Sequence, residues 1–286
     1  MPAELYRSLP QEYANAFAVL RESEHGTESM LRHDFNGSLG YIGQAWEDFE
    51  EELEVEISRF EDLFILDFAD LIEITDEDIS ARIPQLDILD FDQIDEDPRN
   101  RSYIETRQAF APYTAGALMV FRDSIGYFYN EVNGSKEGAT KYLEKLRDRQ
   151  VPLKPLTDYF QAQLEAEEDL TVNGLEYVIL YNLLKNAASH TRNDHRLRID
   201  GYFSVVRVDS DTGDFEVTNN LMKGKFVEQD AVLDPLAFVR KSKYDSYSHG
   251  YGLFIASVLS HQLGKTFQAT KTAQGLFVAE VRTDII

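Results

Sequence analysis

Two asparagines four residues apart are the side chains of this sequence best suited to hold a cation. Asn182 and Asn186 lie in the stretch YNLLKNAASHT, residues 181–191. Residues four apart on a helix share a face, so both amide oxygens can point at one hard cation such as Mg2+. An amide pair alone binds magnesium weakly, and the ion commonly brings phosphate oxygens with it. The pair therefore predicts a site for magnesium together with a phosphorylated ligand.

A second candidate element is the glycine-containing stretch SHGYGLFI, residues 248–255. Gly250 and Gly252 stand just before an apolar helical pattern, where backbone N–H groups at a helix N-terminus can approach phosphates. Lys241 and Lys243 precede them in a stretch that we expect to form a lid. They could neutralise phosphate charge, and the reading as ordinary solvated loop charges carries equal weight.

The third candidate is a histidine followed directly by an acidic residue. His33 and Asp34 lie in MLRHDFNGSL, residues 30–39. On a helix His33 falls about 160° from Phe35 and the apolar stripe that Phe35 begins, so it is expected to face solvent. Asp34 can hold the proton on one ring nitrogen, which leaves the lone pair of the other free to attack a phosphorus atom.

Together these motifs resemble the sensor histidine kinase family. Residues 181–191 look like the N-box of the ATP-binding domain shared by histidine kinases, gyrase and related ATPases, residues 248–255 are similar to the G2 box, and residues 30–39 resemble the H-box. Asn182 stands where ATP-hydrolysing members place a glutamate, which favours phosphoryl transfer over hydrolysis. The resemblance implies that seven residues around two asparagines bind ATP and Mg2+, with His33 as the phosphoacceptor. That set is Asn182, Asn186, Asn219, Gly250 and Gly252 with the lid residues Lys241 and Lys243, and the magnesium ligands are Asn186 and Asn182.

The sequence departs from the family pattern at several of these places. Asn219 stands where the family has the aspartate that receives the adenine amino group, and it can accept that hydrogen bond only without charge assistance. Leu221 replaces a glycine, and Ser189 replaces an expected basic residue. Two alternatives therefore stay open: a histidine phosphotransferase that has lost nucleotide binding, and a pseudokinase scaffold that binds a basic partner through its acidic region.

The apolar periodicity divides the chain into two halves. Apolar residues recur every three or four positions from Leu31 to Phe64, which predicts one long helix from about residue 28 into the 70s. A second helical stretch follows from Arg101 to Tyr129, and a short helix reaches Arg149 after the interruption at Asn133 and Gly134. We expect residues 1–149 to form an all-α helical hairpin that pairs in a dimeric four-helix bundle.

The second half, residues 150–286, mixes helical and strand patterns. Helices are expected at residues 175–188 and 253–263, strands at 202–209 and 214–219, and a closing hairpin at 267–281 around Gly275. This order predicts an α+β two-layer sandwich, and the resemblance makes it the ATP-binding layer of the histidine-kinase and gyrase type.

Charge and composition limit the partners. The 286 residues include 51 acidic and 28 basic ones and no cysteine, for a net charge of -23. Residues 47–97 carry 21 acidic and two basic residues, so 19 of the 23 net negative charges lie there. Such a chain repels nucleic acid and anionic membrane surfaces, and from the hydropathy pattern we expect neither a membrane span nor a signal peptide. We expect a cytoplasmic homodimer whose partners are a response regulator receiver domain and an upstream sensor protein.

Overall fold

The computed structural model describes residues 6–23, 27, 30–31, 68–82, 98–167, 169–191, 197–221, 227–237, 239 and 251–283, with the backbone alone described at 68, 82, 98–114 and 191. No helix within these described ranges is both long enough and apolar enough to cross a membrane.

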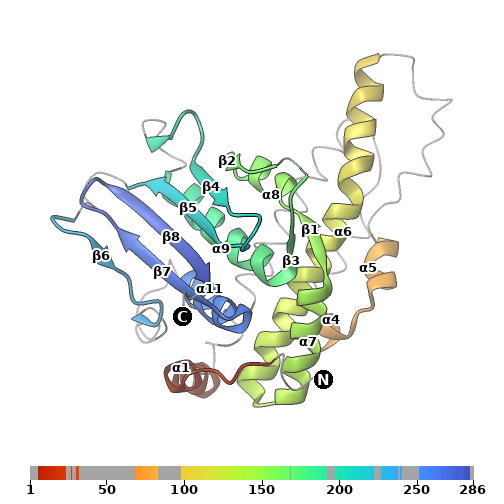
Figure 1. The fold of residues 1–286 in the computed structure, drawn as a ribbon. Helices are drawn as coiled ribbons and strands as arrows, with labels where there is room; N and C mark the ends of the chain where they lie inside the picture. The colour runs from red at the N-terminus through yellow and green to blue at the C-terminus, as the bar shows by residue number, and fades with distance from the viewer. Residues whose placement is uncertain are drawn as a thin grey trace.

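The first half of the described chain is helical (Figure 1). Its helices are α1 (Gln11–Glu22), α4 (Phe68–Glu73), α5 (Asp76–Arg82), α6 (Pro98–Asn133) and α7 (Lys136–Asp148). Between α6 and α7, Gly134 adopts a φ of 74°, a left-handed value that glycine reaches without steric strain. The Ser135 hydroxyl then accepts a hydrogen bond from Gly138 N at 3.3 Å and begins α7. The predicted interruption at Asn133 and Gly134 is thus confirmed.

Most of the helix predicted from about residue 28 into the 70s, residues 32–67, lies outside the described residues. At its predicted end, helix α4 ends at Glu73 and α5 begins at Asp76. Thr75 makes the break, because its hydroxyl accepts from Asp78 N at 3.1 Å while Asp78 Oδ2 accepts from Thr75 N at 3.3 Å. This reciprocal pair is a capping box, a helix-start signal with the spacing Thr-x-x-Asp.

The second half alternates helices and strands. In chain order it holds β1 (Gln150–Pro152), α8 (Lys154–Tyr159), β2 (Ala162–Glu165), β3 (Thr171–Asn173), α9 (Gly174–Thr191), β4 (Ser204–Val208), β5 (Phe215–Asn220), β6 (Ala231–Val232), α11 (Tyr251–Leu263), β7 (Lys265–Lys271) and β8 (Leu276–Thr283). Strands β1 and β3 pair antiparallel, and six others form a sheet of order β2-β4-β5-β8-β7-β6. Only β2 and β4 pair in parallel among its neighbours.

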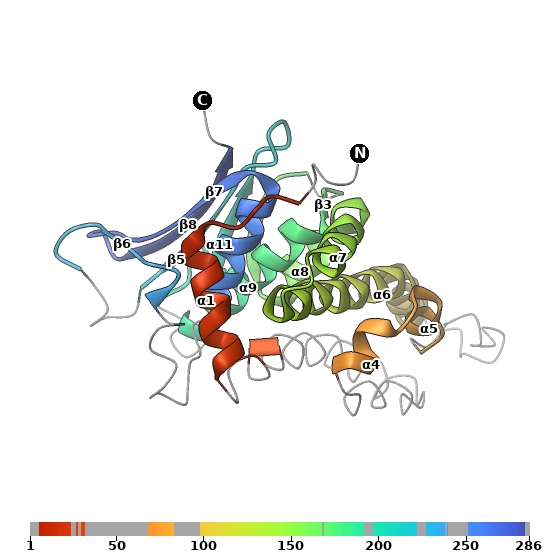
Figure 2. The same cartoon turned by 90° about the horizontal axis from the view of Figure 1, so that it is seen from below.

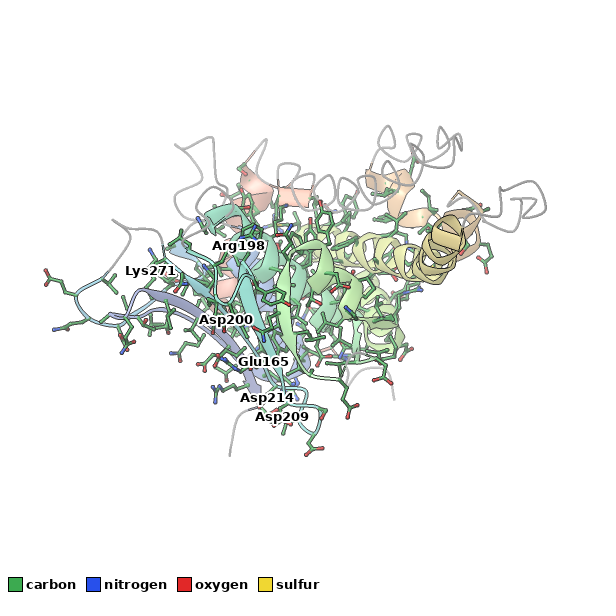
Figure 3. All side chains as sticks on the ribbon, turned by 90° about the horizontal axis from the view of Figure 1, so that it is seen from above. Glu165, Arg198, Asp200, Asp209, Asp214 and Lys271 are labelled. Atoms are coloured by element: carbon green, nitrogen blue, oxygen red, sulfur yellow. The ribbon has the colours of Figure 1, made fainter. Side chains whose placement is uncertain are left out.

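The six-stranded sheet has one buried face and one wet face. Helices α9 and α11 cover the buried face (Figures 1 and 2), where Val217, Ala279 and Val281 are fully buried. On the other face Arg207 Nε lies 2.6 Å from Glu165 Oε2, and Arg207 Nη1 lies 2.9 Å from Glu216 Oε1. Figure 3 shows Glu165 among the charged side chains that the strands carry there. A sheet solvated on one side alternates apolar and polar residues in this way.

The predicted fold class is wrong. In place of an all-α helical hairpin and a separate α+β sandwich, the described residues form a mixed α/β fold, with an N-terminal helical region followed by helices and a mixed sheet. The reason is that α6 and α7 bury their apolar faces against α9 of the same chain. The Phe121 ring of α6 lies 4.7 Å from that of Tyr181, and a Cβ at Gly174 would lie 2.7 Å from Leu146 O of α7. One hydrophobic core runs through both halves. The pairing of two chains in a four-helix bundle stays a prediction.

Candidate functional site

Asn182 and Asn186 lie on the side of α9 that meets α11. Asn182 is 3% exposed, and its Nδ2 donates to Val178 O at 3.0 Å, one turn back along the helix. Asn186 is half-buried. A buried amide on an apolar helix must satisfy its N–H groups, and the carbonyl four residues back is the nearest acceptor. Asn182 is thus fixed in place, while Asn186 keeps access to solvent.

Gly252, the second residue of α11, faces both asparagines. A Cβ built on it would lie 3.0 Å from Asn186 Nδ2 and 3.2 Å from Asn182 Oδ1. Carbon atoms prefer separations of about 3.5–4.0 Å, so a side chain at this position would crowd both amides. Glycine therefore allows the start of α11 to approach the asparagine face of α9 closely.

The contacts of Lys265 show in which direction α9, β5 and α11 run. Its Nζ lies 3.8 Å from Glu176 Oε1, in the first turn of α9, and 3.3 Å from Asp214 Oδ1, just before β5. Helix α11 ends at Leu263, two residues before Lys265. So α9 and β5 both begin at this end of the layer, and α11 ends there.

The lengths of these elements bring the three polar features to the opposite end. From 176 to 186 α9 rises about 15 Å, at the helical rise of about 1.5 Å per residue. From 214 to 219 β5 rises about 16 Å at about 3.3 Å per residue, and from 263 back to 252 α11 spans about 16 Å. Asn186, Asn219 and Gly252 therefore lie at similar heights, at the end of the layer away from Lys265.

Asn219 is on the helix-facing side of β5. It alternates with Phe215 and Val217, both members of the buried core, and is itself 2% exposed. Its Nδ2 donates to Asn220 O at 3.0 Å, a bond that does not use its amide oxygen. After β5, Leu221 N donates to Gly275 O at 2.7 Å, so the end of the strand is tied to the turn of the closing hairpin.

Five residues predicted for the site lie outside the described residues: His33, Asp34, Lys241, Lys243 and Gly250. The structure therefore brings together Asn182, Asn186 and Gly252, places Asn219 at the same end, and leaves the other predictions as they stood.

The structure also contains a buried charge cluster that the sequence reasoning missed. Arg122 and Asp123 of α6 are 1% and 0% exposed. Arg122 Nη2 lies 2.6 Å from Asp76 Oδ1 and 2.7 Å from Asp123 Oδ1, and Nη1 donates to Ile74 O at 2.7 Å. Arg149 Nη2 lies 2.6 Å from the other Asp76 oxygen. Two adjacent charges inside the apolar stretch ALMVFRDSIGYF, residues 117–128, are the signal that could have revealed it.

The pKa values of the two carboxylates in this cluster, Asp123 and Asp76, are shifted in opposite directions. Burial dominates at Asp123 and raises its pKa, although Arg122 opposes the shift. Burial also acts on Asp76, but hydrogen bonds from Arg149 and Arg122 outweigh it and lower the pKa of Asp76. The ion pairs and hydrogen bonds of the cluster hold the turn at Thr75, between α4 and α5, against α6 and the end of α7.

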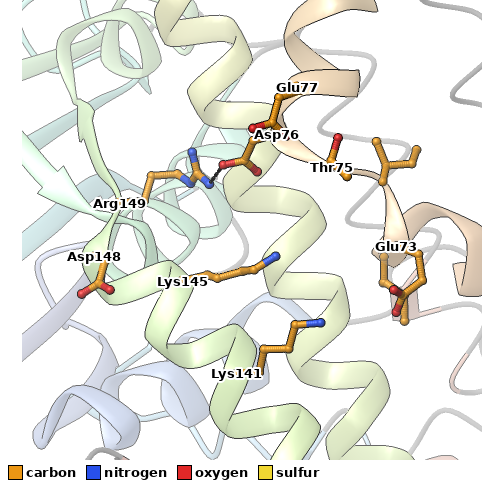
Figure 4. Close-up of a pocket in the computed structure, with 10 residues that line it drawn as sticks. Glu73, Thr75, Asp76, Glu77, Lys141, Lys145, Asp148 and Arg149 are labelled. Carbon is orange, nitrogen blue, oxygen red and sulfur yellow. Dashed lines mark hydrogen bonds and ion pairs between the residues drawn. The ribbon is translucent and has the colours of Figure 1, made fainter.

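A polar cleft of about 700 Å³ opens beside the cluster, between α4–α5 and α7. Figure 4 shows Lys141 and Lys145 reaching from α7 into it, with Arg149 bonded to Asp76 at its edge. Carboxylates of Glu73 and Glu77 line the opposite wall. Because the walls carry both signs of charge, the cleft favours neither an anion nor a cation.

Among the described residues there is no group of three or more His, Cys, Asp or Glu side chains that could hold a metal ion. The amide pair of α9 stays a predicted cation site. No protein-family model matches the sequence, and no curated protein matches it.

Proposed function

We propose that this chain is a cytoplasmic protein-histidine kinase. ATP binds with magnesium at the end of the C-terminal layer where Asn186, Asn219 and Gly252 lie, and the γ-phosphoryl group is transferred to His33. A receiver-domain aspartate of a response regulator then accepts it. The expected roles of Lys241, Lys243 and Gly250 belong to the same proposal.

The close approach at Gly252 carries this proposal. A Cβ there would lie 3.0 Å from one amide and 3.2 Å from the other, so the backbone at the N-terminus of α11 stands directly against two polar side chains. Backbone N–H groups at a helix start attract phosphate, and nearby amide oxygens suit a hard cation. This pairing is what a nucleotide with a divalent ion requires.

The described residues fit a magnesium ion. Asn186 is the accessible amide, whereas Asn182 is buried and donates to Val178 O. Asn186 would hold the ion, and the Oδ1 of Asn182 would be the second candidate oxygen. The ion supplies positive charge that offsets the phosphate oxygens.

The chemistry at His33 is a direct displacement. One ring nitrogen attacks the γ-phosphorus, a nitrogen–phosphorus bond forms, and the bond from phosphorus to the β,γ-bridging oxygen breaks with its electrons on ADP. Asp34 holds the proton of the other ring nitrogen. Positioning of the reactants contributes much of the rate enhancement in phosphoryl transfer, because the protein does little covalent chemistry in this reaction.

Labelling with γ-³²P-ATP and Mg2+ tests the proposal. The purified chain should acquire a phosphoryl group that acid removes and base does not, and His33→Gln should abolish it. His25→Gln is the matched control, since it removes a nearby imidazole of the same segment. Equal labelling of His33→Gln and the parent chain would refute the assignment of His33, and failure of ATP to bind would refute the kinase.

Asn219 and Leu221 favour a second candidate, the histidine phosphotransferase. Asn219 offers an uncharged amide, and Leu221 is 6% exposed and occupies the position of a family glycine. In that case the chain accepts a phosphoryl group from a phosphorylated receiver domain on His33 without binding nucleotide. Incubation with labelled phosphoreceiver in the absence of ATP separates the two functions.

A second copy of the chain and an upstream sensor protein remain the partners that we expect for either function. Light scattering of the purified chain tests the first of these.

A further inference from the structure

The residues before and within α1 form a strap across the back of α11. We use the name N-terminal strap for residues 6–22. Figure 2 shows α1 beside α11, although most of the chain separates them in sequence. None of the motifs assigned to the proposed site lies within the strap.

Aromatic rings form the centre of this contact. Phe254 of α11 is fully buried, and its ring lies 5.3 Å from that of Phe17 and 6.3 Å from that of Tyr13. The Tyr13 hydroxyl also shares a short hydrogen bond with Ser257 Oγ. Edge-on ring pairs of this kind stabilise beyond their buried area.

Hydrogen bonds extend the contact to the end of α11. Arg7 N donates to Gln262 Oε1 at 3.2 Å, and Gln262 Nε2 donates to Arg7 O at 2.9 Å. His261 Nε2 lies 3.1 Å from Ser8 O. The strap thus holds α11 from its first turn to its last.

The face of α11 that the strap holds is opposite the face that carries Gly252. Two helical residues turn about 200°, so Phe254 points away from Gly252. Ser257 and His261 follow Phe254 at spacings of three and seven and share its face. Helix α11 is therefore held between α9, through Gly252, and the strap, through Phe254.

We infer that the N-terminal strap is a positioning element of the proposed nucleotide site. It acts through α11, by setting the distance between Gly252 and the two asparagines. This inference rests on the proposed function, because it names a control element of the same site. A loosened strap weakens nucleotide binding, and bound nucleotide in turn tightens the strap, because coupling between two sites is reciprocal.

Hydrogen exchange on the unaltered chain tests one direction of the coupling. With ADP and Mg2+ as the probe, we expect slower amide exchange in α9 and α11 and also in α1. Calorimetric titration of variants tests the other direction. Tyr13→Phe combined with Phe17→Leu keeps most of the packing, and we expect it to raise the Kd for ADP about fivefold or more, the lower range of measured coupling.

Val19→Ala is the matched control, since Val19 lies on the same helix and is 42% exposed; its Kd should stay within about twofold of the parent value. Ser257→Ala removes the hydroxyl that Tyr13 contacts and keeps the test open if the double variant does not fold.

A double-mutant cycle separates positioning from mere stabilisation. If the strap acts through Gly252, its effect on Kd should largely disappear in a Gly252→Ala background, whereas independent effects add. Slowed exchange in α9 and α11 without slowing in α1, or an unchanged Kd in the strap variants, would overturn the strap inference and leave the kinase proposal standing. Failure of the parent chain to bind ADP would overturn both.

Discussion

Replacing Gly252 with alanine separates a local clash at the predicted site from a general loss of stability. The new Cβ would lie 3.0 Å from Asn186 Nδ2, 3.2 Å from Asn182 Oδ1 and 3.6 Å from Asn182 Cβ. Asn186 is the end of a flexible side chain and can move by a few tenths of an ångström. Asn182 cannot move as easily, because its other amide atom donates to Val178 O.

Two opposing contributions of similar size then change the free energy of unfolding. Alanine is favoured over glycine inside a helix by about 1 kcal/mol, and crowding a packed position costs about 1–3 kcal/mol. The free energy of unfolding should fall by about 0–2 kcal/mol, and the midpoint of thermal unfolding by less than about 8 °C. No such gain offsets the effect on nucleotide affinity, because the added methyl group displaces the amides of Asn186 and Asn182 that the proposed site uses. We expect the Kd for ADP with Mg2+ to rise about tenfold or more, which corresponds to about 1.4 kcal/mol.

Calorimetric titration with ADP, together with thermal unfolding of the same preparations, measures both quantities. Gly116→Ala is the matched control: Gly116 lies in α6, and its Cβ would meet only Val151 Cγ2 at 4.0 Å. That variant should be more stable than the parent chain by about 1 kcal/mol, because alanine is favoured over glycine inside a helix, and it should bind ADP like the parent chain. If Gly252→Ala bound ADP with an unchanged Kd while the parent chain bound it well, the close approach at Gly252 would not be part of a phosphate site, and the argument built on it would be wrong.

Two further substitutions test other parts of the structure. We expect the parent chain to bind ADP about 2–10-fold more tightly than inosine diphosphate, which lacks the exocyclic amino group, since one hydrogen bond has about this value. Asn219→Ala should abolish this preference. Competition titrations measure the preference, and an unchanged preference would contradict the assigned role of Asn219. Asp76→Asn should lower the free energy of unfolding by about 1–3 kcal/mol near pH 7, since it removes charged hydrogen bonds to the buried Arg122 and to Arg149. Because the pKa of Asp76 is lowered on folding, its contribution is complete above the unfolded pKa of about 3.9 and is lost as the pH falls through the folded value. Urea unfolding should therefore show the difference between Asp76→Asn and the parent chain shrinking below about pH 4, and a difference that is constant with pH would contradict the ionic role of Asp76.

The C-terminal elements were predictable because their signals are local. The helical spacing of residues 175–188 and 253–263 corresponds to α9 and α11, and the strand patterns before Asn219 and around Gly275 correspond to β5 and to the hairpin of β7 and β8. The short strands β1 and β3 have three residues each, too few to show an alternation. Their pairing depends on residues that are distant in the sequence.

The fold class failed for a different reason. An apolar helical stripe shows that one face is buried and does not show against what. The predicted helical hairpin suggested a partner hairpin, whereas Phe121 of α6 packs on Tyr177 and Tyr181 of α9 in the same chain.

The two asparagines show where spacing stops being informative about chemistry. Their separation of four residues places both on one face and makes them equivalent as cation ligands. Burial removes that equivalence: Asn182 is 3% exposed and bonded to Val178 O, whereas Asn186 is half-buried. Since the Nδ2 of Asn182 is committed to its own helix, its Oδ1 is held toward Gly252 and sets how closely α11 can approach. Asn186 retains the freedom to turn its oxygen toward a ligand. The two asparagines look alike in the sequence, but the packing of α11 on α9 makes Asn182 a buried spacer and leaves Asn186 as the more accessible candidate ligand.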